Sequence, residues 1–291
     1  MKKKRTTLNP LLIILIFAVV AVVITVAVVL SKGYRYITYD GAKFLGVAKY
    51  GVPYEGKIKY SNGMTAQLDS EAHTITYSNG DEYVGDIYLV FRHGNGKHTF
   101  KTTGDVYEGA FANDKLTGYG VYSYADGSKY EGNLVDSVRQ GKGLYIAANG
   151  DRYEGEFINN LLQGIGEVRL ADGYTYKGNF VNNVQNGEGE CIYANGDTYK
   201  GSFVNNIRHG QGVYVWSNGE EYTGQFINGK RDTRLVDEKG DFQQNSDGSY
   251  IHGEQAVYKW PSGKIYTGFF EDDLIMVVEK NADETEYQAE N

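Results

Sequence analysis

Five histidines and one cysteine are the side chains of this sequence that most often bind metals or act as nucleophiles. His93, His209 and His252 each stand directly before a glycine, at the loop end of a predicted hairpin. His73 and His98 have no cysteine or acidic residue at the spacing of a zinc ligand set. We therefore predict no metal site among the histidines.

Cys191 takes a position that tyrosine holds in three neighbouring stretches of similar sequence, at Tyr122, Tyr145 and Tyr214. We interpret it as a small buried apolar residue and not as a nucleophile, and a single cysteine excludes an internal disulfide framework. The sequence contains no nucleophile elbow, phosphate-binding loop or metalloprotease helix. The prediction is a protein that is not an enzyme, with no catalytic residues and no cofactor.

Aspartates recur after turn glycines and could attract Ca²⁺ as a ladder. They are Asp81, Asp105, Asp151 and Asp197. One carboxylate per turn is few beside the six to eight oxygens that Ca²⁺ takes. We interpret these aspartates as turn residues and predict no metal.

The elements that must position all these residues are copies of one short sequence. Tyr107-Glu-Gly-Ala-Phe111 returns every 23 residues, at Tyr130, Tyr153, Tyr176 and Tyr199. A Gly-x-Gly pair follows each tyrosine by about eleven residues, and an Asn-Gly or Asp-Gly dipeptide stands seven residues after the pair. A fixed period in the twenties indicates a repeat array whose units contact only their neighbours.

Alternation within each copy predicts strands. Tyr107, Gly109 and Phe111 share one face of a strand, and the Asn-Gly or Asp-Gly dipeptide predicts a hairpin turn whose two residues both tolerate positive φ. Each unit is therefore two antiparallel strands, and the strand glycines leave room for a ring from the neighbouring strand. About ten such units, at roughly 10 Å each, predict a twisted all-β ribbon on the order of 100 Å long.

The pattern Tyr-x-Gly-x-Phe-x-Asn-Asn, followed by Gly-x-Gly-x-Tyr and Asn-Gly, resembles the MORN repeat (membrane occupation and recognition nexus). Residues 199–219 match it almost throughout. The resemblance implies an elongated antiparallel sheet of β-hairpins that serves as an assembly or adaptor module, as in junctophilins and plant phosphatidylinositol phosphate kinases. It also raises the binding of anionic phospholipids, which is proposed for some MORN proteins.

The array is predicted to span residues 40–278, with degenerate copies at 64–80 and 230–253. The second of these lacks the Gly-x-Gly pair, but Gly240 recovers a turn position, so we interpret it as a worn unit inside the array. Leu274–Val278 is predicted as a final strand. Residues 279–291 are predicted as an acidic disordered tail.

An apolar segment precedes the array. Residues 1–10 are basic, and residues 11–30 contain one polar side chain, Thr25. Roughly 20 apolar residues suffice for a transmembrane helix, whereas a signal peptide has a shorter apolar core that ends in a small-x-small site. We predict a signal anchor with residues 31–39 as a tether, a cytoplasmic N-terminus and extracytoplasmic repeats; the alternative is secretion after cleavage.

Charge limits the partners. Five of the 29 basic residues lie in the first 33 positions, so 24 remain against 37 acidic residues, a net charge of −13. An acidic body is repelled by anionic phospholipid headgroups and by nucleic acid. We therefore predict that neither binds the repeat region.

The predicted function is a membrane-anchored, non-enzymatic scaffold that docks another protein or a second copy of itself. An edge strand or the row of hairpin loops would contact the partner; that row comprises Asn159-Asn160, Asn182-Asn183 and Asn205-Asn206. The alternative is a module that binds an envelope glycan or lipid through aromatic rings. The two differ in whether Tyr122, Tyr145 and Tyr214 are buried, and individual binding residues are not predicted.

Overall fold

The computed structural model of the protein describes residues 10–280 and 285–290. The chain divides into two compact units, residues 1–125 and 126–291. Residues 1–9, most of the predicted basic N-terminus, lie outside the described residues. The predicted length of the whole ribbon stays a prediction.

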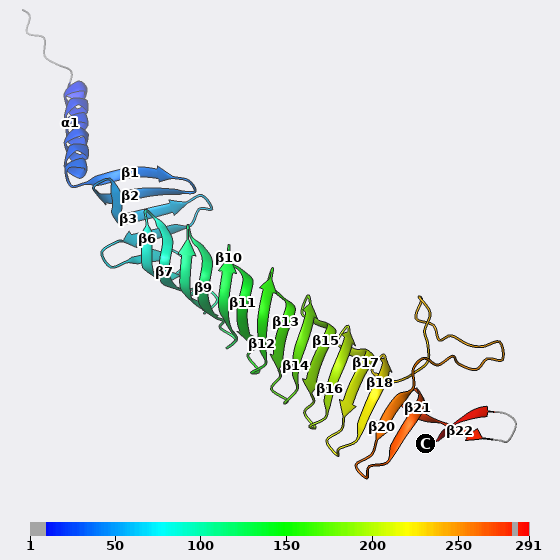
Figure 1. Ribbon diagram of the computed structural model, residues 1–291. Helices are drawn as coiled ribbons and strands as arrows, with labels where there is room; N and C mark the ends of the chain where they lie inside the picture. Colours follow the sequence, from blue (N-terminus) through cyan, green and yellow to red (C-terminus); the bar gives the residue numbers. More distant parts are fainter. Residues whose placement is uncertain (1–9, 281–284, 291) are drawn as a thin grey trace, which may run out of the picture. The chain divides into compact units, whose positions relative to one another are not determined.

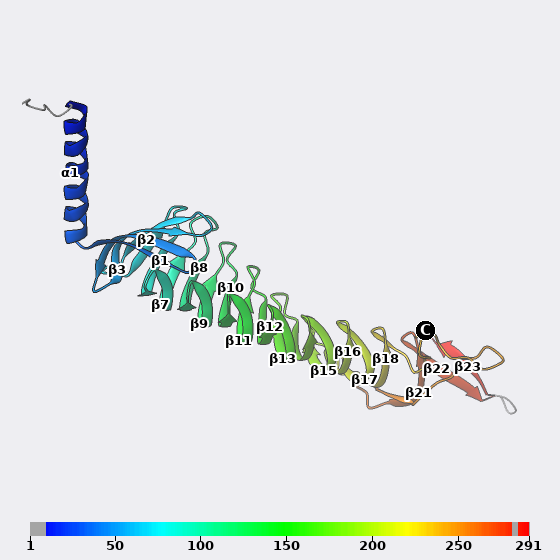
Figure 2. The same ribbon diagram turned by 90° about the horizontal axis from the view of Figure 1, so that it is seen from above.

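Unit 1 begins with one apolar helix, α1 (Pro10–Ser31), drawn in blue in Figure 1 and in dark blue in Figure 2. The turn after the helix contains Gly33, whose φ of +84° suits the left-handed residue that follows many helices. The side chains of residues 10–14, 16 and 17 are not described. No helix among the described residues is long and apolar enough to cross a membrane.

Strands follow one another as antiparallel neighbours in unit 1, each paired with the next along the chain. They are β1 (Tyr34–Tyr39), β2 (Ala42–Lys49), β3 (Val52–Tyr60), β4 (Thr65–Asp69), β5 (Thr74–Tyr77), β6 (Glu82–Tyr88), β7 (Phe91–Thr99), β8 (Val106–Ala112) and β9 (Lys115–Ser123). The predicted tether therefore needs correction. Residues 34–39 form β1 because their alternating aromatic and β-branched residues favour a strand on the edge of β2.

Unit 2 continues the pattern, and its hairpins stand side by side in sequence order from green to yellow in Figure 1. Its regular strands are β10 (Lys129–Val135), β11 (Val138–Ile146), β12 (Arg152–Ile158), β13 (Leu161–Arg169), β14 (Thr175–Val181), β15 (Val184–Ile192), β16 (Thr198–Val204), β17 (Ile207–Val215) and β18 (Glu221–Ile227). The remaining strands are β19 (Lys230–Arg231), β20 (Ala256–Lys259), β21 (Ile265–Glu271), β22 (Leu274–Lys280) and β23 (Thr285–Glu290). The predicted all-β array of antiparallel hairpins is confirmed.

The prediction that both residues of the Asn-Gly and Asp-Gly turns take positive φ needs correction. The two-residue turns with positive φ at both positions lie at the asparagine pairs, for example Asn159 (+51°) and Asn160 (+70°). At Asn195-Gly196 only the glycine has positive φ (+89°), and the N–H of Gly196 donates to the Tyr193 carbonyl at 2.9 Å. This is a β-turn followed by a left-handed glycine, because the chain needs a third residue there to reach the next strand.

The core lies on one face of the sheet, where rings pack over glycines. The buried Tyr176 ring meets Phe180 and Phe203 edge-on at 5.1 and 5.0 Å, and its hydroxyl donates to the Asn179 carbonyl at 3.1 Å. A Cβ built on Gly189 would lie 2.5 Å from that ring. The predicted room for a ring over the strand glycines is confirmed. We call this side of the sheet the aromatic face.

One repeat of unit 2, which starts at Tyr153, departs from this packing. Tyr153 is only half-buried, and a Cβ on Gly155 would meet Leu162 first, at 2.9 Å. Leu162 therefore takes the space over the glycines that a tyrosine ring fills in the repeats that start at Tyr130, Tyr176 and Tyr199.

The predicted degenerate unit at 230–253 needs correction, because most of it leaves the sheet. β18 pairs with both β19 and β20, with Tyr222 opposite Tyr258, so the second strand of this hairpin is interrupted. Residues 232–252, which we call the excursion, project beside β18 and β20 in Figure 1. The excursion lacks the Gly-x-Gly pair that receives a tyrosine ring, so it cannot pack as a further unit.

The C-terminal end also differs from the prediction. Leu274–Val278 falls in β22, which pairs with β21 as expected. The predicted disordered tail is wrong for residues 279, 280 and 285–290, since Thr285–Glu290 forms β23 against β22. Backbone pairing with β22 supplies the hydrogen bonds that acidic composition alone does not predict. Residues 281–284 and 291 of that tail lie outside the described residues.

Candidate functional site

Each turn aspartate bridges to the next hairpin along the chain. The Oδ1 of Asp197 accepts the backbone N–H of Ser217, twenty residues on, at 2.8 Å. Asp81, Asp105 and Asp151 accept the N–H groups of Lys101, Ala125 and Ala171 in the same way. In Asp151 the bond from Ala171 N–H, followed by one from the Asn149 side chain, lowers the pKa of the carboxyl. These carboxylates therefore join neighbouring hairpins. No group of three or more His, Cys, Asp or Glu in the described part of the chain could hold a metal ion.

The asparagine turns form a second ladder at the other end of the hairpins. The Oδ1 of Asn160 accepts the N–H of Arg139 at 2.9 Å, and Asn183 and Asn206 repeat this bond with Leu162 and Gln185. Asn182 also accepts a bond from Gln163, so four of the six asparagine side chains in the predicted contact row are occupied within the array. Contact between this row and a partner stays a prediction.

His98 is buried, with 2% of its surface exposed. Its Nδ1 lies 2.8 Å from Nη1 of Arg92, which can only donate, so Nδ1 accepts and the ring is neutral. Nε2 faces Asp81 at 3.7 Å. The ring packs 4.2 Å from Phe100. His98 is therefore a core residue of unit 1, a role that the sequence did not predict.

Acid is expected to destabilise unit 1 through His98. Burial, followed by the Arg92 guanidinium, lowers the pKa of His98 from 6.5 to about 4. The unfolded chain takes up the proton first, so stability is complete above about pH 6.5 and falls as the pH decreases toward 4. The loss should reach on the order of 3 kcal/mol, measured by urea unfolding between pH 7 and 4. A His98→Phe variant should lose less over this range, and an equal loss in both proteins would contradict the assignment.

A row of partly exposed rings crosses the hairpins of unit 2 on the aromatic face. Neighbouring ring centroids lie 5.7 Å (Tyr174–Tyr193), 5.8 Å (Tyr193–Tyr214), 4.6 Å (Tyr214–Trp216), 5.5 Å (Trp216–Tyr258) and 4.7 Å (Tyr258–Trp260) apart. We call these six residues the Tyr/Trp row. Tyr214 and Tyr258 are buried, and the other four are half-buried. Sequence reasoning singled out Tyr214 but not the other five rings, although an aromatic residue three positions before a turn glycine marks Tyr193, Trp216 and Trp260.

Guanidinium groups lie over the Tyr/Trp row. Arg208 lies 4.6 Å from the centre of the Tyr214 ring, and Arg231 lies 5.3 Å from that of Trp216. Arg231 is ion-paired with Asp273 at 3.1 Å, whereas Arg208 donates to the Gly229 carbonyl and has no carboxylate partner among the described residues. Neither indole N–H of Trp216 and Trp260 has an acceptor in that part of the chain. The row thus offers ring faces together with unused donors.

Two further residues singled out from the sequence are accounted for by packing. Cys191 is buried, and burial raises the pKa of its thiol, so it is a poor nucleophile. His209 receives a long bond, 3.5 Å, from the Asn228 N–H at its Nδ1.

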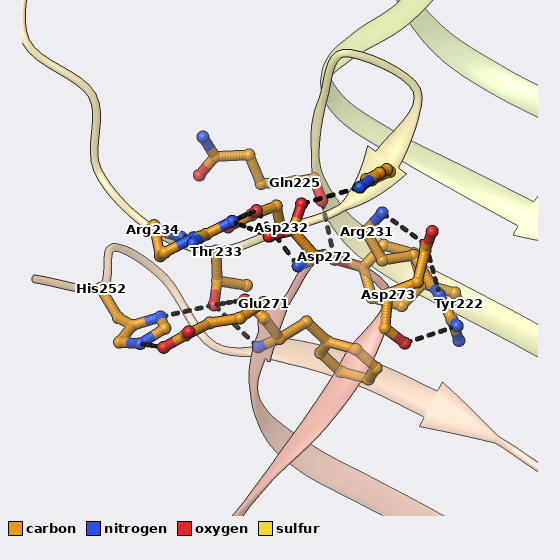
Figure 3. Close-up of polar contacts among 12 residues, drawn as sticks. Tyr222, Gln225, Arg231, Asp232, Thr233, Arg234, His252, Glu271, Asp272 and Asp273 are labelled. Atoms are coloured by element: carbon orange, nitrogen blue, oxygen red, sulfur yellow. Dashed lines mark hydrogen bonds and ion pairs between the residues drawn. The ribbon is translucent and has the colours of Figure 1, made fainter. Parts of the chain in front are cut away.

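The excursion is fastened by a buried polar cluster, shown in Figure 3. Arg234 is 4% exposed and Asp232 is 1% exposed, and their ion pair measures 2.5 Å. Arg234 also pairs with Asp272 at 2.8 Å and lies over the Phe242 ring at 3.7 Å. Hydrogen bonds from Arg234 to Asp232 raise the pKa of the guanidinium further. The cluster thus holds the start of the excursion, at Asp232 and Arg234, both against Asp272 and against the Phe242 ring within the excursion.

His252 belongs to the same anchor. Its Nδ1 lies 2.9 Å from the Thr233 hydroxyl and its Nε2 lies 3.0 Å from Glu271, an order that resembles a catalytic triad. Thr233, however, has no exposed surface, and its oxygen accepts the Phe270 N–H at 2.9 Å. A substrate cannot reach that hydroxyl. His252 ties the excursion to β21, a role that its position before Gly253 did not predict.

The architecture places the chain among antiparallel hairpin-repeat proteins. The family profile described as the MORN repeat matches residues 107–129, 130–152, 153–173, 176–198, 199–221 and 222–232. The chain therefore carries MORN repeats between residues 107 and 232. The resemblance seen in the sequence is confirmed for this stretch.

Comparison with characterised proteins gives short or distant matches. MORN repeat-containing protein 3 of Xenopus laevis is 36% identical over 61 residues, which cover 21% of this chain and 26% of that protein. The match therefore spans about a quarter of this relative. Among solved structures, the TCP10 domain of Danio rerio CPAP in complex with a peptide of STIL has a TM-score of 0.39 at 11% identity, covering 81% of this chain and 98% of that one. The Drosophila melanogaster SAS-4 TCP domain with a proline-rich motif of Ana2 has a TM-score of 0.31 at 13% identity, covering 77% and 96%. Both TM-scores are too low to relate those domains to the function of this chain.

Proposed function

We propose that this protein is a non-enzymatic scaffold whose MORN-repeat array docks a partner protein on the aromatic face of unit 2. The observation that carries the proposal is the Tyr/Trp row. Half-buried tyrosine and tryptophan with free N–H donors are the residues that protein interfaces favour at their centres. The aspartate and asparagine ladders use part of the polar groups at the ends of the hairpins, whereas the indole N–H groups of the Tyr/Trp row have no acceptor among the described residues.

We further propose that residues 11–30, twenty residues with one polar side chain, hold the scaffold at a membrane, with the N-terminus in the cytoplasm and the repeats outside. Among the side chains described between Leu15 and Leu30, the apolar ones, such as Val22 and Val23, are exposed. The one polar side chain there, Thr25, donates its hydroxyl proton to the Ala21 carbonyl at 2.8 Å, as hydroxyl groups do in an apolar environment. Secretion after cleavage stays the alternative.

The glycan alternative has less support. It requires exposed rings, but Tyr214 is buried and Tyr122 and Tyr145 are half-buried. Arg208 also covers the face of Tyr214 that a sugar would stack on. We therefore favour a protein partner over an envelope polymer.

Removing the two indoles of the row is expected to abolish docking. Full-length protein carrying Trp216→Ala and Trp260→Ala should recover at least tenfold less of a discrete partner, about 1.4 kcal/mol or more, when cross-linked in its native membrane and analysed by mass spectrometry. The reason is the loss of the two tryptophan rings, the largest side chains of the row, together with their unused N–H donors.

The matched control is Ile192→Ala with Ile265→Ala. Both isoleucines are exposed, at 51% and 59%, and lie on the opposite face of the sheet. This variant should keep the partner. The proposal is contradicted if the tryptophan variant, with an unchanged circular dichroism spectrum, retains the same partner, or if the repeats sediment with isolated envelope polymer and no protein is recovered.

A further inference from the structure

A second surface lies in unit 1, before the segments that match the MORN profile. A groove of about 540 Å³ runs across the exposed face of β1 to β5. Its walls include Tyr36, Lys43, Leu45, Lys57, Lys59 and Gln67. The volume lies in the range of sites that enclose a small ligand or a few residues of a chain.

Three of the residues that line the groove are lysines, and the fold places no counter-charge beside them among the described residues. Lys43 stands directly opposite Lys59 on the neighbouring strand, and Lys57 stands opposite Leu45. All three lysines are exposed, and none has an ion-pair partner among the described residues. Like charges placed directly opposite each other destabilise a sheet. Their concentration contrasts with the acidic balance of the whole chain.

The same groove offers apolar contacts beside the charges. Tyr36 is 64% exposed and Leu45 is 55% exposed, and they are cross-strand neighbours. One row further along the strands, Glu55 stands opposite Asp69 on the same face. The positive charge is thus confined to one end of the face, next to Tyr36 and Leu45, and the opposite end is acidic.

We propose that this groove binds an acidic, extended segment of a partner protein, whose carboxylates meet Lys43, Lys57 and Lys59 while its apolar side chains pack on Tyr36 and Leu45. The inference rests on the scaffold function proposed above and adds a second docking point. A concave groove suits a polypeptide segment better than a bilayer, because a flat surface of headgroups touches protrusions and would also meet Glu55 and Asp69.

The test uses the full-length protein in zwitterionic nanodiscs. The probe is a fluorescent octapeptide of alternating glutamate and leucine, compared with the same peptide containing glutamine in place of glutamate. Fluorescence anisotropy should show at least tenfold tighter binding of the glutamate peptide, with affinity falling as salt rises from 50 to 500 mM. Lys43→Gln, Lys57→Gln and Lys59→Gln together should weaken binding at least tenfold. Exposed positions tolerate this change, and relief of the Lys43–Lys59 repulsion should leave the melting temperature equal or higher.

The control removes three exposed strand lysines elsewhere, Lys97→Gln, Lys142→Gln and Lys177→Gln, and should leave peptide binding unchanged. Equal binding of the two peptides, or equal loss in both triple variants, would overturn the proposal. So would loss of binding to phosphatidylserine vesicles in the groove variant without any binding of the peptide. The Trp216 and Trp260 variant should still bind the peptide, so failure of the groove and failure of the aromatic face can be told apart.

Discussion

Adding one methyl group at Gly189 is expected to destabilise unit 2 by about 3 kcal/mol, at the upper end of the usual cost of overpacking. The Cβ of Gly189→Ala would lie 2.5 Å from the Tyr176 ring, whose hydroxyl is held by the Asn179 carbonyl. The ring is buried and packs edge-on against Phe180 and Phe203, so it cannot move aside without disturbing those contacts. Urea unfolding followed by circular dichroism measures the change.

The matched control is Gly166→Ala, at the same position of the preceding unit. There Tyr153 does not cover the glycine, and the nearest atoms to a new Cβ lie 3.0 to 3.2 Å away. We expect a cost of about 1 kcal/mol. Equal costs at the two positions would mean that the packing of the Tyr176 ring over Gly189 is not the cause of the destabilisation.

Replacing Asp232 by alanine is expected to cost about 3 to 5 kcal/mol, because it leaves the Arg234 guanidinium buried without its main partner. Arg234 would keep only Asp272, which is half exposed. Release of the excursion should accompany the loss, so amide hydrogen exchange within residues 233–252 should accelerate in the variant. Unfolding in urea gives the free energy.

Two comparisons identify the cause. Glu221→Ala breaks a half-exposed pair with Lys259 and should cost about 1 kcal/mol or less. Replacing Asp232 and Arg234 together by leucine and methionine should recover much of the loss, since no buried charge then lacks a partner. If the double variant is as unstable as Asp232→Ala, the ion pair is not what fastens the excursion.

Features that a single strand carries could be predicted from the sequence. Alternation of Tyr176, Gly178 and Phe180 indicates a strand with one aromatic face, and the recurrence of glycine on that face indicates rings packed over it. Both hold in the structure because ring and glycine belong to one hairpin, where the spacing along the chain fixes which residues meet.

Features that depend on neighbouring units were less accessible. The bond from Ser217 N–H to Asp197 spans twenty residues, and nothing in the Asp197 turn itself reveals that its carboxylate faces the next unit. The prediction of the turn geometry at the Asn-Gly dipeptides failed for a related reason. Asn-Gly and Asn-Asn both tolerate positive φ, and the choice between them depends on how far apart the strand ends lie.

The candidate site was the least predictable part. The Tyr/Trp row joins rings from positions as distant as Tyr174 and Trp260, and it becomes continuous only because the excursion lets Tyr258 take the place beside Tyr222. The lysine groove likewise depends on the pairing of Lys43 with Lys59, which required β1 to β5 to be one sheet. Net charge, an average over the chain, conceals such local separation.

The length of the excursion has a consequence for how this protein could be rebuilt. Arg231 bonds to Asp273, 42 residues on, where Arg139 bonds to Asn160 after 21. The excursion therefore adds 21 residues, the same number that separates Arg139 from Asn160. The strands on either side of the excursion pair with β18 as the second strand of an uninterrupted hairpin would. The segment between Arg231 and Gly253 is therefore a suitable insertion point, at which a compact foreign domain with adjacent termini could be displayed while the neighbouring hairpins keep their pairing.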